Sequence, residues 1–189
     1  MRIRFPIAYA VLASLTLAGC VSAPAPKYQP SVDNSALVLK HRPIVDVGPF
    51  TAAAGVQNRA LSMRGSKLQG GADGTYSTYL RDALITELQV AGGYVPGSNL
   101  RIEGELTHNR LDVSGIKVGK AEVGARFIVR RGDHVVYDRT LQIEHTWESS
   151  FIGALAIQAG IDNYGTTVQK LIGTLLADPE FISAIQPVS

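Results

Sequence analysis

Apolar residues in the second half of the chain repeat with a helical period in two places. Between Thr75 and Val90 they recur three or four positions apart, and Gly92-Gly93 follows as a stop signal. A longer apolar seam with 4-3-4-3-4 spacing consists of Ile157, Ile161, Tyr164, Val168, Leu171 and Leu175. Asp178-Pro179 then supplies an N-cap residue and a proline for the first helical position. The pattern predicts two amphipathic helices and a short one after them.

The segments between the two long helices have the alternating pattern of strands. Residues 100–107 place apolar and polar side chains on opposite faces, as expected for a strand with one face on a core. Residues 121–131 and 135–147 are two more such segments, and Gly132-Asp133 between them predicts a hairpin turn. Their outer faces carry opposite charges, so cross-strand pairing is expected.

The part of the chain before residue 75 has a weaker pattern. Leu37–Leu39 and Ile44–Val47 are rich in strand-forming residues, which predicts strand structure within residues 36–50. Residues 51–74 are polar and rich in glycine, which predicts a long loop with at most a short strand around Leu61–Met63.

These elements together favour an α+β fold. We expect an antiparallel sheet of about four strands with two helices packed on one face. No internal repeat divides the chain, so residues 36–189 are expected to form one domain.

The first residues have a different character. Arg2 and Arg4 precede an apolar run from Phe5 to Leu17, the arrangement of a secretory signal. This run of about 13 residues is shorter than the roughly 20 that a membrane-spanning helix needs. We therefore interpret residues 1–19 as a cleaved signal peptide.

The signal ends in Leu17-Ala18-Gly19-Cys20, which resembles the lipobox of bacterial lipoproteins. Cys20 is the only cysteine of the chain, and the resemblance implies that its thiol carries a diacylglycerol. More than one acyl chain is what stable membrane anchoring requires. Val21 follows in place of the aspartate that retains such proteins in the inner membrane. By that sorting rule we expect the outer membrane, on its periplasmic face.

Composition restricts the function further. Residues 20–35 contain three prolines and predict an extended tether between the lipid and the domain. The net charge of +2 is contributed by the two arginines of the signal, so the remaining chain is neutral. This balance does not favour nucleic-acid binding, which normally shows a basic excess.

Three stretches resemble a known group of proteins: Tyr79–Leu88 running into Ala91-Gly92, Arg126–Tyr137, and Tyr164–Phe181. They resemble small periplasmic lipoproteins of Gram-negative bacteria with an α+β fold. That group includes auxiliary lipoproteins of ABC-type lipid-transport systems and the lipopolysaccharide-assembly lipoprotein. The resemblance covers about residues 44–185. It implies docking onto partners, and it carries over no catalytic residue.

Candidate chemistry is sparse. His108 and His145 lie on predicted strands and could bind zinc with Glu105 or Glu144, but their spacing matches no metal motif, so ordinary strand-face histidines are the simpler interpretation. Residues 70–74 precede a helix, and their amides could hold an anion, or they could simply form a loop into a capped helix. No serine lies in a nucleophile motif.

One segment stands out as a candidate interaction patch. Between Trp147 and Ala159 the chain has a single charge, Glu148. Its large apolar residues are Trp147, Phe151, Ile152, Leu155 and Ile157. They could be buried under the sheet, or they could form an exposed surface that meets a partner or lipid.

We therefore expect a membrane-anchored envelope protein that acts as a non-catalytic binding, assembly or transport-accessory module. Its expected contacts are the membrane, through the lipid, and an envelope protein or transporter, with no cofactor and no metal. Two alternatives remain: an enzyme that modifies envelope glycans or lipids, and a structural lipoprotein that self-associates through its helix seam.

Overall fold

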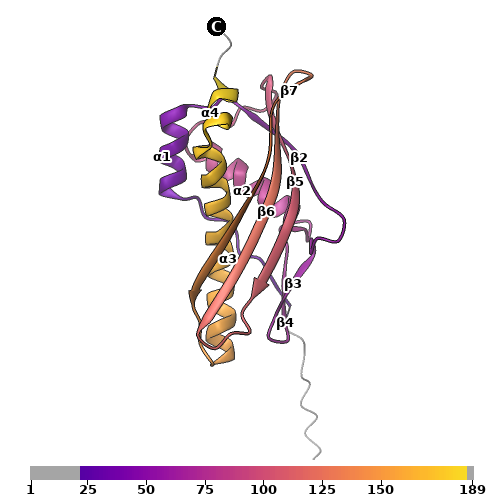
Figure 1. Cartoon of the computed structure of the whole chain (residues 1–189), viewed down its shortest axis with the longest axis vertical. Coiled ribbons are helices and arrows are strands. Elements are labelled where there is room, and N and C mark those ends of the chain that lie inside the picture. Colours follow the sequence, from indigo (N-terminus) through magenta and orange to yellow (C-terminus); the bar gives the residue numbers. More distant parts are fainter. Residues whose placement is uncertain (1–21, 187–189) are drawn as a thin grey trace, which may run out of the picture.

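The computed structural model describes residues 22–186 (Figure 1). The predicted signal peptide, Cys20 and Val21 lie outside the described residues. The elements in chain order are β1 (Ser22–Pro24), α1 (Val32–His41), β2 (Asp46–Ala52), β3 (Ala60–Met63), β4 (Ser66–Gln69), α2 (Tyr76–Val90), β5 (Leu100–Asp112), β6 (Val118–Arg131), β7 (His134–Glu148), α3 (Gly153–Ala177) and α4 (Pro179–Ile185).

The main sheet has four strands in the order β2-β5-β6-β7. Strands β5, β6 and β7 are antiparallel neighbours joined by short connections, as the alternation predicted. Strand β2 instead pairs in parallel with β5, because the chain between them crosses over through α2. The α+β class is confirmed, whereas the prediction of a purely antiparallel sheet with two helices is wrong.

A second, smaller sheet has the order β1-β4-β3. Strands β3 and β4 form a hairpin within the segment predicted as a long loop, and the short strand around Leu61–Met63 is part of it. Arg64 and Gly65 at its turn both have positive φ, 46° and 84°, the backbone that a two-residue hairpin requires. The hairpin was not predicted because each strand has only four residues. The alternation of apolar and polar residues is too short to stand out in a glycine-rich segment.

The prediction of a strand at Leu37–Leu39 is wrong, because these residues belong to α1. Ser31 caps this helix by accepting a hydrogen bond from the Asn34 amide, and Arg42 ends it with a φ of 48°. Only Asn34 and Val38 of α1 are buried. Because one of these two buried residues is polar, the helix has only a weak apolar pattern, and the strand-forming residues dominated the prediction.

The predicted tether also differs from the structure. Ser22, the first described residue, already pairs with Lys67 of β4. Tyr28 is buried and donates a hydrogen bond of 2.5 Å to Glu87 of α2. The segment between β1 and α1 is therefore held to β4 at Ala25 and to the helices at Tyr28 and Gln29.

The helices lie on one side of the main sheet (Figure 1). Helix α2 packs on β2 and β5, α3 packs on β6 and β7, and α1 lies across α2 and α3. The seam of α3 is used inside the domain, since Tyr164, Val168 and Leu171 are almost fully buried. Asp178 and Pro179 start α4 as predicted. Within residues 22–186, no helix combines the length and apolarity needed to cross a membrane.

Candidate functional site

A groove of about 560 Å³ opens where the N-terminal segment crosses α2. Its walls are Pro24–Tyr28, the loop after β4, and the exposed side of α2. Most of its lining is apolar side chain or glycine backbone, with Lys27 and Asp82 as the charged members. Such a lining suits an extended or amphiphilic ligand more than a reacting group.

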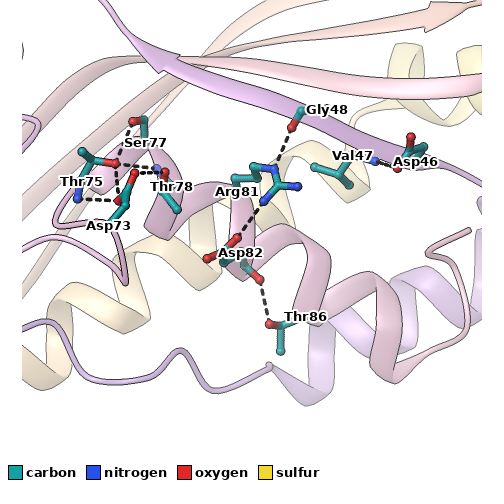
Figure 2. Close-up of polar contacts among 10 residues, drawn as sticks. All are labelled: Asp46, Val47, Gly48, Asp73, Thr75, Ser77, Thr78, Arg81, Asp82 and Thr86. Atoms are coloured by element: carbon teal, nitrogen blue, oxygen red, sulfur yellow. Dashed lines mark hydrogen bonds and ion pairs between the residues drawn. The ribbon is translucent and has the colours of Figure 1, made fainter. Parts of the chain in front are cut away.

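The start of α2 borders this groove, and its first amides are capped by side chains that precede the helix (Figure 2). Asp73 accepts hydrogen bonds from the amide and hydroxyl of Thr75 and from the hydroxyl of Thr78, all at 2.7–2.8 Å. The amide of Thr78 is capped by Thr75, and that of Ser77 by Asn58. The hydrogen bonds from the two threonines hold the pKa of Asp73 below its usual value.

This geometry decides between the two interpretations of residues 70–74. Gly71 and Gly74 donate to carbonyl oxygens within the same loop, and a carboxylate already lies at the helix start. Most of the amides that could have held an anion are therefore occupied, and the loop leads into a capped helix.

Further along α2, Arg81 holds the helix to the main sheet. Its Nε donates to the Gly48 carbonyl oxygen of β2 at 3.0 Å, and its Nη1 pairs with Asp82 at 3.2 Å (Figure 2). The wall of the groove is thus fixed to an edge strand.

A buried carboxyl group fixes the other wall. Glu87 is fully buried and accepts hydrogen bonds from Tyr28 Oη, the Ser31 amide and Asn34 Nδ2. Burial, and then the bond to Glu87, raises the pKa of Tyr28 far above its usual value. These three donors, from the N-terminal segment and α1, all bind the carboxylate oxygens of Glu87 in α2. The groove is therefore preformed.

The second candidate surface is an apolar end of the molecule, where β6 starts and β7 leads into α3. Phe151 is 78% exposed, and Leu155 is 57% exposed. With Ile116, Val118 and Ile152, which are also exposed, they form what we call the apolar end.

The sequence-based patch overlaps the apolar end in part. Phe151, Ile152 and Leu155 are exposed, whereas Trp147 and Ile157 are half-buried against the core. The ring of Trp147 covers Gly119, where a Cβ atom would lie 2.5 Å from it. Sequence reasoning missed Ile116 and Val118, although two apolar residues around a lysine between Gly115 and Gly119 were a signal for an exposed apolar turn.

Arg64 holds the two connections of the apolar end together. Its Nε donates to the Val113 carbonyl oxygen at 2.6 Å. Its Nη atoms donate to the carbonyl oxygens of Gly115, Ser150 and Phe151 at 2.9–3.1 Å.

Among the described residues, the only buried side-chain polar atoms without a partner are Trp147 Nε1 and Ser149 Oγ, both in this region. Most buried polar groups in folded proteins have a hydrogen-bond partner.

The histidines do not form a site. His108 faces the open side of the sheet and contacts Glu122 at 2.8 Å. His145 faces the helices and contacts Asn163 and Lys170 of α3. In the part of the chain that the structure describes, no group of three or more potential metal ligands converges.

The open face of the sheet carries the expected cross-strand pairs. Arg126 forms two hydrogen bonds with Asp138, at 2.6 and 2.7 Å, and these bonds lower the pKa of Asp138. Arg130 pairs with Glu103, and Lys120 with Glu144. This face is typical of a solvated surface.

No family model matches the chain, and no curated protein is similar to it in sequence. A Xanthomonas campestris protein of the DUF330 family has a similar solved structure: it is 16% identical, the match covers 82% of this chain and 90% of that one, and the TM-score is 0.50. The shared fold is what this similarity shows.

Two more solved structures are similar at lower TM-scores. A candidate lipoprotein of Caulobacter crescentus is 11% identical over 84% of this chain and 100% of its own, with a TM-score of 0.47. A minor lipoprotein of Acinetobacter baumannii is 10% identical over 72% and 90%, with a TM-score of 0.41. None of the three names specifies a transport or lipopolysaccharide-assembly system.

Proposed function

We propose that this protein is a lipid-anchored envelope lipoprotein that acts as a non-catalytic binding module, an accessory to transport or assembly at the outer membrane. The anchor is Cys20 at the end of the signal peptide, and Val21 directs the protein outward. The lipoprotein names of two similar structures agree with this proposal.

The observation that carries the proposal is the position of the groove next to the anchor. Pro24 lines the groove and follows Cys20 by four residues, which span at most about 14 Å when extended. A ligand or partner segment in the groove would therefore lie near the membrane surface, where an accessory to lipid or polysaccharide transport has to work.

A binding role fits the groove better than catalysis does. The two histidines lie on opposite faces of the sheet, and Asp82 in the groove is paired with Arg81. Self-association through the helix seam has little support, because that seam packs inside the domain.

A pull-down with the full-length protein from detergent-solubilised envelopes tests the proposal. Ala72→Trp places a large ring at the exposed rim of the groove, and Ala54→Trp makes the same change on an exposed loop after β2. We expect the same envelope partner with the wild type and Ala54→Trp, and a clear loss with Ala72→Trp. Equal recovery with both variants, or no reproducible partner, would contradict the proposal.

A further inference from the structure

The chain enters the domain at the same end of the molecule that carries the apolar side chains. Ser22 pairs with Lys67, directly beside the β3–β4 turn. Arg64 of that turn reaches the carbonyl oxygens of Val113 and Phe151. In Figure 1 the β3–β4 hairpin and the start of α3 lie at one end of the long axis, and α4 lies at the other.

The distance from the anchor to this end is short. Cys20 precedes Ser22 by two residues, which reach at most about 7 Å. Since Ser22 is already held in the small sheet, a lipidated Cys20 would bring this end of the domain against the bilayer. The chain leaves no length for a tether that could turn the apolar end away.

We propose that the apolar end inserts into the lipid surface to which Cys20 is anchored, as a second, non-covalent membrane contact. The proposal rests on the proposed lipid anchor and assigns the lipid surface as the occupant of the patch. Phe151 and Leu155, from the connection before α3 and its first turn, are its most prominent side chains, and Ile116 extends it from the loop before β6.

The charges around the apolar end indicate which force drives the contact. Lys67 and Lys117 lie at this end, but so do Asp112 and Glu148 at the ends of β5 and β7. The guanidinium group of Arg64 is also at this end, where it is bound to backbone carbonyl oxygens. The balance favours apolar insertion over attraction to anionic headgroups. The long stem of Lys117, between Ile116 and Val118, can follow them while its ammonium group stays in water.

The contact can be measured with a fluorescent probe in the full lipidated protein. The Cys20 thiol is consumed by the lipid, so a cysteine introduced by Leu155→Cys is the only free thiol. Val135→Cys is the matched control, because Val135 is 50% exposed and lies at the far end of β7. Each variant carries a polarity-sensitive probe in vesicles of phosphatidylethanolamine and phosphatidylglycerol that contain a lipid-borne spin-label quencher.

We expect several-fold stronger quenching and a blue shift at position 155, and little of either at 135. Equal quenching at both positions, or a probe at 155 that remains in water, would overturn the proposal. A probe at 155 that remains in water would instead indicate that the apolar end binds a protein partner, since these vesicles contain no other protein.

A second measurement separates this proposal from the anchor itself. Within the described residues, the buried core extends from Tyr28 to Ile185, so a chain that starts at Val21 keeps all of these core residues. We expect this unlipidated chain to float with the same vesicles, with little effect of salt. The double variant Phe151→Ser/Leu155→Ser should bind about tenfold less or weaker still, and Val135→Ser should bind as the wild type does.

The two proposals then fail separately. An unmodified Cys20 in the mass of the cellular protein would refute the anchor. Equal flotation of the wild type and the double variant would refute lipid insertion, whatever the state of Cys20.

Discussion

Glu87 links the N-terminal segment and α1 to α2. It is fully buried, and its carboxyl group accepts from Tyr28, Ser31 and Asn34. Removing an acceptor from several buried donors costs more than losing the hydrogen bonds alone, because the donors cannot return to water. The N-terminal segment, one wall of the groove, is the part that would be released.

We predict that Glu87→Ala lowers the free energy of unfolding by about 3–5 kcal/mol. Glu87→Gln, which keeps one acceptor, should cost about half as much. Gln89→Ala, at an exposed position of the same helix, is the control and should change stability by less than about 0.5 kcal/mol. Urea denaturation measures all three, and equal stabilities of the alanine variants would contradict the role of Glu87.

Buried tyrosines make the fold sensitive to base. Burial raises the pKa of Tyr79 from 10.0 to about 12, and it also raises the pKa values of Tyr28, Tyr76 and Tyr164. The folded state thus favours the protonated form. The resulting stability is fully present below the unfolded pKa of 10.0 and is lost as the pH rises through about 12.

We therefore predict a cooperative unfolding between pH 10 and about 12. Circular dichroism and tyrosinate absorbance, followed together through a pH titration, should change in the same step. Ionisation of most tyrosines near pH 10.0 with unchanged circular dichroism would contradict the prediction.

This residue-scale chemistry could be predicted from the sequence only in part. Asp73 or Thr75 as the cap of α2 followed from local spacing, and both contribute. The role of Glu87 could not be predicted, because Tyr28 lies 59 positions away in the chain. Local patterns contain no information on such a contact.

Among the elements, α3 contains two glycines with different packing. A Cβ atom at Gly160 would lie 2.5 Å from Val113 Cγ1 of the connection after β5. At Gly165 the nearest atom is Tyr79 Oη at 3.9 Å, an ordinary contact distance. The first glycine permits close packing, and the second only weakens the helix.

We predict opposite effects of the same substitution at these two positions. Gly160→Ala should destabilise the protein by about 1–3 kcal/mol through overpacking. Gly165→Ala should stabilise it by up to about 1 kcal/mol through helix propensity. Thermal or urea unfolding measures both changes in stability. Val113→Ala should partly restore the stability lost in Gly160→Ala, and it should not change the effect of Gly165→Ala.

At this scale, pattern strength determined what the sequence could predict. Helices α2, α3 and α4 and strands β5 to β7 have long or well-capped patterns, and they were predicted with ends within about five residues of the observed ones. Helix α1 has two buried residues, and β3 and β4 have four residues each, so their patterns are short. The parallel pairing of β2 with β5 depends on the crossover through α2, which no local pattern records.

For the whole molecule, the main change from the sequence-based expectation is the loss of the tether. A domain on a flexible linker could present any face to a partner. A domain that is already packed at Ser22 has a defined end near the proposed anchor, with the groove beside it and the charged sheet face on another side. Orientation, as well as attachment, then becomes part of the proposed function.

The central claim is that the mature protein begins with a lipid-bearing Cys20. Intact-mass spectrometry of the protein extracted from membranes tests it most directly. We predict cleavage before Cys20 and added mass on the N-terminal cysteine, and a Cys20→Ala variant should lack both. A wild-type protein with an unmodified Cys20, or one cleaved elsewhere, would contradict the account.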